Sequence, residues 1–129
     1  MKIDHIAIWT NQIDKLKLFY MEHFSASVFK YFVNPKTQFE SCNLIFPSGI
    51  QLELMQAPDV EKNKHTLTSR VMGYSHLAFS VGSKSEVNKV TDRLRSKGCL
   101  VIDLPRAYGD GFYESIVLDP DGNRIEIKE

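Results

Sequence analysis

The sequence predicts an α+β fold in which two βαβββ modules follow one another within a single domain of 129 residues. The first observation is a repeated phrase: polar residue, histidine, aliphatic, alanine, apolar residue. It reads DHIAI at 4–8 and SHLAF at 75–79. The second is that a helical segment and three strand-like segments follow each copy. We expect module 1 at about 1–57, a linker at 58–73 and module 2 at about 74–129, which together complete one core.

Two segments have the apolar spacing of amphipathic helices. Their apolar residues are Ile13, Leu16, Phe19 and Phe24 within 11–24, and Val87, Val90 and Leu94 within 83–97. We expect Asn11 to cap the first helix. The second opens with Ser83 and Glu86 in a capping-box pattern and stops at Gly98, which suits the left-handed position after a helix end.

Each module begins with a strand that carries the histidine phrase and continues with three strands after its helix. These later strands are predicted at 27–33, 38–46 and 50–56, and again at 100–105, 112–118 and 123–128. Phe39-Glu40-Ser41 recurs as Tyr113-Glu114-Ser115, and the turn Pro47-Ser48-Gly49 as Pro120-Asp121-Gly122. The last strands also match, with Gln51-Leu52-Glu53-Leu54 against Arg124-Ile125-Glu126-Ile127.

Four polar residues fall on the strand faces that point away from the helices. Side chains alternate along a strand, so His5 and His76 each share a face with the alanine two positions later, and Glu53 and Glu126 lie between apolar neighbours. If both modules place their sheets alike, the four converge on one concave surface. Two carboxylates brought together either raise a proton affinity or demand a cation. This donor set suits a divalent Zn, Ni, Co, Mn or Fe ion with open positions for substrate.

The amino-acid composition limits the classes of partner that the protein is expected to bind. Sixteen basic residues balance sixteen acidic ones, which excludes the basic surface of a nucleic-acid binder. No apolar run reaches the roughly 18 residues of a membrane span or forms a signal sequence, and only Cys42 and Cys99 occur. We therefore expect a cytoplasmic protein with free thiols and no membrane or nucleic-acid partner. The other histidines, His23 and His65, are expected at the surface.

The chain resembles the vicinal oxygen chelate superfamily, which groups glyoxalases, bleomycin-resistance proteins and extradiol dioxygenases. The phrases GYSHLAFSV and LDPDGNRIEI carry the resemblance, and DHIAIWT followed by KLKLFY agrees with it. The resemblance implies a glyoxalase-like fold, in which paired βαβββ modules form a curved mixed sheet around a metal-binding cavity. It also implies a homodimer.

Within that superfamily the order His-Glu-His-Glu resembles glyoxalase I, the lactoylglutathione lyase. His5, Glu53, His76 and Glu126 fill its four metal positions. Extradiol dioxygenases and fosfomycin-modifying relatives use two His and one Glu, epimerases tend to carry Gln where Glu53 stands, and bleomycin-binding relatives lack the ligands. The resemblance implies a metal-dependent lyase or isomerase that acts on an α-oxo compound or its thiol hemithioacetal, with Glu126 as base and Glu53 as its counterpart on the opposite substrate face.

The expected substrate pocket departs from the glyoxalase I pattern. Trp9 stands where that family commonly has an arginine, and Ala57 where it has an asparagine for glutathione, so the thiol could be glutathione or another. Trp9 either stacks on an aromatic or apolar substrate or packs inside the protein. The loop 106–115 is expected to bring Arg106, Asp110, Tyr113 and Glu114 near one rim, with Arg106 either binding a substrate anion or remaining solvated. The alternatives are a non-catalytic binding protein for a drug or metabolite, of the bleomycin-resistance kind, and an epimerase or dioxygenase.

Overall fold

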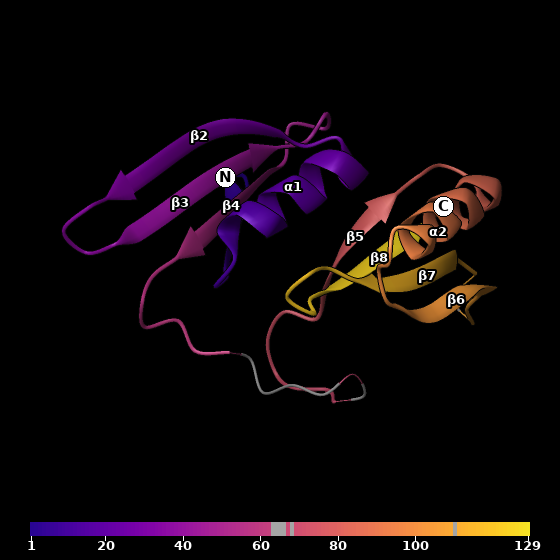
Figure 1. Cartoon of the computed structure of the whole chain (residues 1–129). Helices are drawn as coiled ribbons and strands as arrows, with labels where there is room; N and C mark the ends of the chain where they lie inside the picture. Colours follow the sequence, from indigo (N-terminus) through magenta and orange to yellow (C-terminus); the bar gives the residue numbers. More distant parts are fainter. Residues whose placement is uncertain (63–66, 68, 110) are drawn as a thin grey trace. The chain divides into compact units, whose positions relative to one another are not determined.

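The protein is described by a computed structural model that covers residues 1–62, 67, 69–109 and 111–129. The predicted order of two successive βαβββ modules is confirmed (Figure 1). The elements are β1 (His5–Trp9), α1 (Ile13–Phe24), β2 (Ser27–Asn34), β3 (Phe39–Ile45), β4 (Gln51–Gln56), β5 (His76–Ser80), α2 (Lys84–Ser96), β6 (Val101–Ala107), β7 (Tyr113–Leu118) and β8 (Arg124–Lys128).

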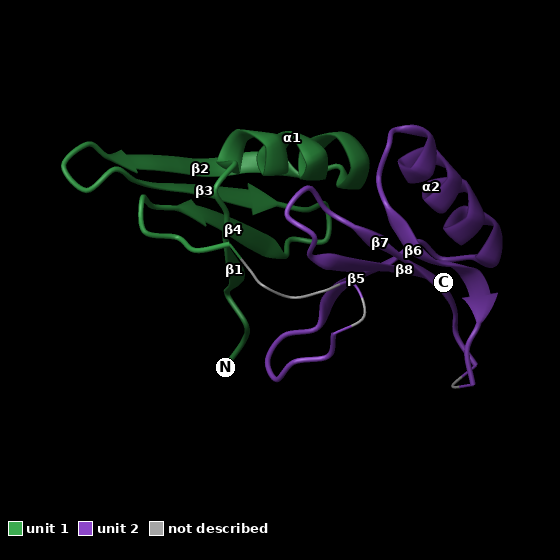
Figure 2. Cartoon of the chain, turned by 60° about the horizontal axis from the view of Figure 1, so that its bottom comes forward, with its two compact units in different colours: residues 1–63 green, residues 64–129 purple. Residues whose placement is uncertain are grey.

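The chain forms two compact units, Met1–Asn63 and Lys64–Glu129 (Figure 2). Each unit is a four-stranded mixed sheet with one helix, in the order β1-β4-β3-β2 or β5-β8-β7-β6. The first and last strands of each module pair in parallel, and the other neighbours are antiparallel. The unit boundary falls inside the predicted linker, of which residues 63–66 and 68 lie outside the described part of the chain.

Each helix covers one face of its own sheet, and the core of each unit lies in that layer. The helix α1 packs on β3 and β4, and α2 packs on β6, β7 and β8. The large side chains that are fully buried are Leu16, Tyr20, Leu44, Leu52 and Leu54 in the first unit, and Val87, Leu94, Val117, Ile125 and Ile127 in the second. Among the described residues no helix has the length and apolar character needed to cross a membrane.

Polar residues also enter this layer. In the second unit the Thr91 and Ser115 hydroxyls lie 2.6 Å apart between α2 and β7, so both buried groups are satisfied. Neither Cys42 nor Cys99, both in the described part of the chain, is in a disulfide. Cys42 is fully buried in the first core, and this burial raises the pKa of its thiol; Cys99 is half-buried.

The two helices begin in different ways. Ser83 caps α2 as predicted, because its hydroxyl accepts a hydrogen bond from the Glu86 backbone N–H at 3.2 Å. The prediction for Asn11 is wrong: Gln12 is the N-cap of α1, and the Asn11 side chain donates to the Val60 carbonyl instead. The Ile13 N–H donates to the Gln56 side chain at 2.9 Å, so a residue from the end of β4 caps this helix.

The strand register corrects one detail of the predicted repeat. Ser41 lies opposite Met55 on β4, and Glu114 lies opposite Lys128 on β8. Ser41 and Glu114 are therefore structurally equivalent, whereas the sequence repeat aligns Glu40 with Glu114. Because a slip of one residue exchanges the faces of a strand, Glu40 faces α1 while Glu114 lies on the opposite side of its sheet.

Tyr31, on the helix-covered face of the first unit, is expected to make the stability of the fold depend on pH in the alkaline range. The Tyr31 hydroxyl donates to Glu40 at 2.6 Å, and this bond, with burial, raises the pKa of Tyr31 from 10.0 to about 12. A raised pKa means that the fold favours the neutral phenol. Its stabilising contribution is complete below pH 10 and is lost as the pH rises through about 12.

We therefore expect the free energy of unfolding of the wild type to exceed that of Tyr31→Phe below pH 10. This difference should disappear by about pH 12. The measurement is urea unfolding of both proteins over this pH range, with tyrosinate absorbance recorded in parallel. A difference that stays constant across the range would contradict the assignment.

Candidate metal centre

The first unit presents one histidine and one glutamate on the sheet face that α1 leaves uncovered. His5 begins β1, and Glu53 lies on the parallel neighbour β4, opposite Ala7. The Nε2 atom of His5 lies 3.4 Å from Oε2 of Glu53. The histidine side chain is 40% exposed and the glutamate 20%, so both are reachable from solvent. Ala7, the residue opposite Glu53, has a small side chain.

The second unit repeats this arrangement with the same spacing. His76 begins β5, Glu126 lies on β8 opposite Ala78, and Nε2 of His76 is again 3.4 Å from Oε2 of the glutamate. The histidine side chain is 39% exposed, close to the value for His5, while Glu126 is more enclosed at 11%. The structure therefore joins the four predicted ligands as two equivalent pairs, one in each unit.

The residue before each histidine holds the other ring nitrogen. Asp4 Oδ2 lies 3.0 Å from Nδ1 of His5, and Ser75 Oγ lies 3.3 Å from Nδ1 of His76. The bond to Asp4, and to a smaller extent the charge of Glu53, raises the pKa of His5; the same bond lowers the pKa of Asp4. A partner at Nδ1 fixes the ring and leaves Nε2 as the donor for a metal.

The chemistry of the two pairs fits a divalent ion. Imidazole nitrogen and carboxylate oxygen are the donors that Zn²⁺, Ni²⁺, Co²⁺, Mn²⁺ and Fe²⁺ accept in proteins, and both imidazoles offer Nε2. Within the described ranges no cluster of three or more His, Cys, Asp or Glu side chains is close enough to hold a metal. Each unit taken alone thus supplies two donors.

Aromatic side chains extend the uncovered face of the first unit. Trp9, Met55, Ser41 and Phe32 form one row across the sheet, next to the row that contains Glu53. Phe39 bridges two of them, with ring centres 6.2 Å from Trp9 and 6.3 Å from Phe32. Trp9 is 52% exposed and Phe32 is 48% exposed, so neither is buried in the core of its unit. We call Trp9, Phe32 and Phe39 the aromatic wall.

The equivalent row of the second unit is charged. It contains Ser80, Lys128, Glu114 and Arg106, in the same order across the sheet. Lys128 Nζ lies 3.6 Å from Glu126 Oε1 and 3.8 Å from Glu114 Oε2, so it is an immediate neighbour of a predicted ligand. Sequence reasoning missed this lysine, although its position two residues after Glu126 places it on the same strand face.

The remaining residues of the predicted pocket have other partners. Arg106 donates to both oxygens of Asp103, at 3.0 and 2.8 Å, and its guanidinium lies 4.0 Å from the centre of the Tyr108 ring. The Tyr108 hydroxyl donates to the same carboxylate. Arg106 is thus already paired with an anion. This pairing also lowers the pKa of Asp103.

Tyr113 lies on the helix-covered face of β7. Its hydroxyl donates to Asn88 of α2 at 2.9 Å, and Lys84 stands over its ring at 5.7 Å. Asp110 and His65 lie outside the described residues. His23, expected at the surface, is half-buried, with its ring centre 5.1 Å from that of Phe19.

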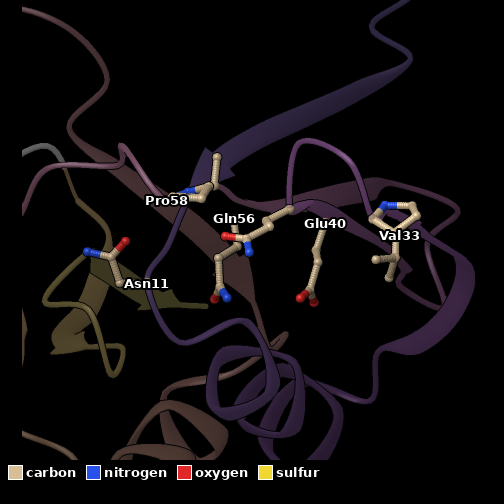
Figure 3. A pocket seen from close by; sticks show the side chains of 8 residues that line it. Asn11, Val33, Glu40, Gln56 and Pro58 are labelled. Atoms are coloured by element: carbon tan, nitrogen blue, oxygen red, sulfur yellow. The ribbon is translucent and has the colours of Figure 1, made fainter.

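A cavity of about 500 Å³ opens in the first unit, near the start of α1 (Figure 3). Its lining consists of Asn11, Val33, Pro35, Gln38, Glu40, Gln56, Ala57 and Pro58, and includes neither His5 nor Glu53. Glu40 and Gln56 are paired in register and alternate with the residues of the uncovered face. The cavity is therefore separate from the His5–Glu53 pair. Ala57, which departs from the glutathione pattern, lines this cavity.

Comparison with known proteins identifies the class of this protein. Residues 2–127 match the Glyoxalase/Bleomycin resistance protein/Dioxygenase superfamily, and the chain belongs to that superfamily. It is also similar to the uncharacterized protein YqjT of Bacillus subtilis, with 39% identity over 59 residues. That match covers 43% of this chain and 46% of YqjT, less than half the length of that relative.

Solved structures confirm the predicted α+β fold of two tandem modules. A glyoxalase family protein from Enterococcus faecalis superposes with a TM-score of 0.80 at 25% identity, over 99% of this chain and 97% of its own. Glyoxalase I from Zea mays gives 0.79 at 21% identity, over 98% of this chain and 44% of its own. The trypanothione-dependent glyoxalase I of Leishmania major gives 0.77 at 23% identity, over 100% and 86%.

Proposed function

We propose that this chain is a metal-dependent enzyme of the glyoxalase I type, a lyase or isomerase that moves a proton next to a carbonyl group. One observation carries the proposal: each unit presents a histidine and a glutamate with a nitrogen–oxygen distance of 3.4 Å on its uncovered sheet face. A histidine–glutamate pair with a purely structural role in one unit would not require an equivalent pair in the other unit. Two pairs with matched spacing, each with Nδ1 held by the preceding residue, suit one shared ion.

In this proposal His5, Glu53, His76 and Glu126 hold one divalent ion, which is Ni, Zn, Co, Mn or Fe. When bound, the ion would supply the Lewis acidity that stabilises negative charge on substrate oxygens. The two pairs come from one chain or from the two chains of a homodimer. The low cysteine content, Cys42 and Cys99 alone, supports a cytoplasmic location.

The proton transfer is assigned to the glutamates. Glu126 takes the proton from the carbon next to the carbonyl group, the bonding electrons pass into the enediolate, and the proton returns to the neighbouring carbon. Glu53 occupies the equivalent place on the opposite face of the substrate. The low exposure of Glu126, 11% of its side chain, supports its role because a site that excludes water limits the loss of the proton to solvent.

The surroundings favour a small α-oxo compound or its thiol hemithioacetal that carries an apolar group. The aromatic wall offers a surface for such a group beside Glu53. Arg106 is paired with Asp103, so it supports no separate site for a glutathione carboxylate. The thiol is glutathione or another small thiol.

The test begins with metal content, measured by mass spectrometry on protein purified without a chelator. We expect about one divalent ion per chain. Turnover of the methylglyoxal–glutathione hemithioacetal, the lactoylglutathione lyase reaction, is then measured after loading with Ni²⁺, Co²⁺ or Zn²⁺. Glu126→Gln should abolish turnover and keep the circular dichroism of wild type, while Glu61→Gln, an exposed glutamate outside the helices and strands, should change neither.

The outcomes separate the reactions of the superfamily. A chain that takes up no ion from any of these metals would contradict the proposal. Metal without turnover would move the search to other thiols and to epimerisation, and oxygen uptake would indicate ring cleavage by a dioxygenase.

A second candidate is a binding protein without chemistry, of the bleomycin-resistance kind. The exposed aromatic wall favours it, since stacking alone holds planar ligands. This candidate predicts that an aromatic drug or metabolite quenches Trp9 fluorescence equally with and without a chelator. Loss of quenching after metal removal would favour the enzyme.

A further inference from the structure

Lys128 is the cation next to the predicted ligand of the second unit. Its Nζ lies 3.6 Å from Glu126 Oε1, 3.8 Å from Glu114 Oε2 and 3.8 Å from the centre of the Phe112 ring. Only 25% of the side chain is exposed. The ammonium is therefore held among two carboxylates and an aromatic face, and it is not a solvated surface charge.

The two oxygens of Glu126 have different neighbours. Oε2 faces the His76 ring at 3.4 Å, while Oε1 faces Lys128. A metal ion shared with His76 would bind Oε2, while the ammonium of Lys128 already holds Oε1 of the same carboxylate. Because like charges repel at short range, the lysine opposes the ion at this ligand.

The first unit has a methionine at the position of this cation. Met55 occupies the position of Lys128, since it lies opposite Trp9 and Ser41 as Lys128 lies opposite Ser80 and Glu114. Among the residues that the structure describes, no lysine or arginine is within ion-pair distance of Glu53. The two pairs have the same nitrogen–oxygen distance, but only the glutamate of the second pair has a described lysine beside it.

We propose that Lys128 is a positioning residue that competes with the metal ion for Glu126 and thereby makes Glu126 the more weakly held of the two glutamates. The inference rests on the proposed metal site and deepens it by assigning different roles to two equivalent residues. Glu53 stays on the ion as a ligand. Glu126 exchanges between the ion and Lys128, which gives it an ionic partner whenever it leaves the ion to face the substrate.

The test is metal affinity, measured by isothermal titration with Ni²⁺ or Zn²⁺ at one fixed pH. Lys128→Met copies the residue of the first unit and should bind the ion about tenfold more tightly, the size expected when one like charge is removed near a divalent ion in a water-like dielectric. Lys128→Arg keeps the charge and should bind as wild type does. The mirror variant Met55→Lys places a charge beside Glu53 and should weaken binding about tenfold.

Turnover gives a second measurement. Lys128→Met should lower kcat and leave KM nearly unchanged, because Glu126 stays on the ion, and Lys128→Arg should restore kcat. Unchanged or weaker metal affinity in Lys128→Met, with wild type binding the ion, would overturn the inference and leave the proposed function intact. A wild-type chain that binds no ion overturns both. If Lys128→Met does not fold, Met55→Lys decides by itself: unchanged affinity overturns the inference.

Discussion

Replacing His76 with alanine is expected to weaken the binding of Ni²⁺ or Zn²⁺ by about a hundredfold or more. Loss of a residue that only supports a ligand already costs 10–100-fold in typical metal sites, and this change removes a ligand itself. His5→Ala should have a similar effect, because the two histidines have the same distance to their glutamates and nearly the same exposure. Isothermal titration on both variants measures the loss.

Two further variants test whether the loss of metal affinity depends on the ligand itself. Asp4→Asn keeps the His5 ligand and weakens only the group that orients it, so a loss of about tenfold is expected. His23→Ala changes a histidine of α1 that contacts Phe19 and belongs to neither pair, and should leave metal affinity unchanged. Full affinity in both His5→Ala and His76→Ala would eliminate the proposed site. A loss in His5→Ala alone would mean that the ion needs only the first unit.

Leu16→Ala is expected to lower the free energy of unfolding by about 2–5 kcal/mol. Leu16 is fully buried between α1 and the first sheet, and its truncation removes apolar contacts and leaves a cavity there. A loss of this size is a large part of the roughly 5–15 kcal/mol that stabilises a typical domain. Urea unfolding followed by circular dichroism measures it.

The same helix supplies the control. Leu18 lies two residues further along α1 and is 59% exposed, so Leu18→Ala removes the same atoms from a surface position. We expect a change within about 0.5 kcal/mol. Equal losses at the two positions would mean that the buried face of α1 is assigned wrongly.

The fold was predictable because its signals are local and occur twice. Helical spacing places Leu16 and Leu94 on buried faces, and both are fully buried. The glycines of the two predicted turns, Gly49 and Gly122, have positive φ angles of 85° and 84°, and each donates to the residue three positions earlier to close its turn. The cap of α1 was not predictable in this way, since Gln56 reaches it from the end of another strand.

The candidate site was predictable to the level of strand faces. Alternation put His5 with Ala7 and Glu53 between leucines, and the structure pairs each histidine with the glutamate of its own unit. The similar sequences of β3 and β7 gave an alignment that is wrong by one residue, because only the hydrogen-bonded register fixes which residue faces the helix. Tyr113 was expected at the cavity rim as part of the loop 106–115, whereas its hydroxyl donates to Asn88 of α2. The pairing of Arg106 with Asp103 spans an irregularity in β6, which no periodic pattern reveals.

The division of the donors between two units has a consequence for assembly under the proposed metal site. Each unit contributes two donors, one histidine and one glutamate. An ion bound by all four side chains would therefore crosslink a first unit to a second unit. By mass action, an ion at a hundred times its Kd adds about 2.7 kcal/mol to the crosslinked state. Metal supply would then govern how firmly the βαβββ units hold together, and a chelator would loosen the assembly at the same time as it stops turnover.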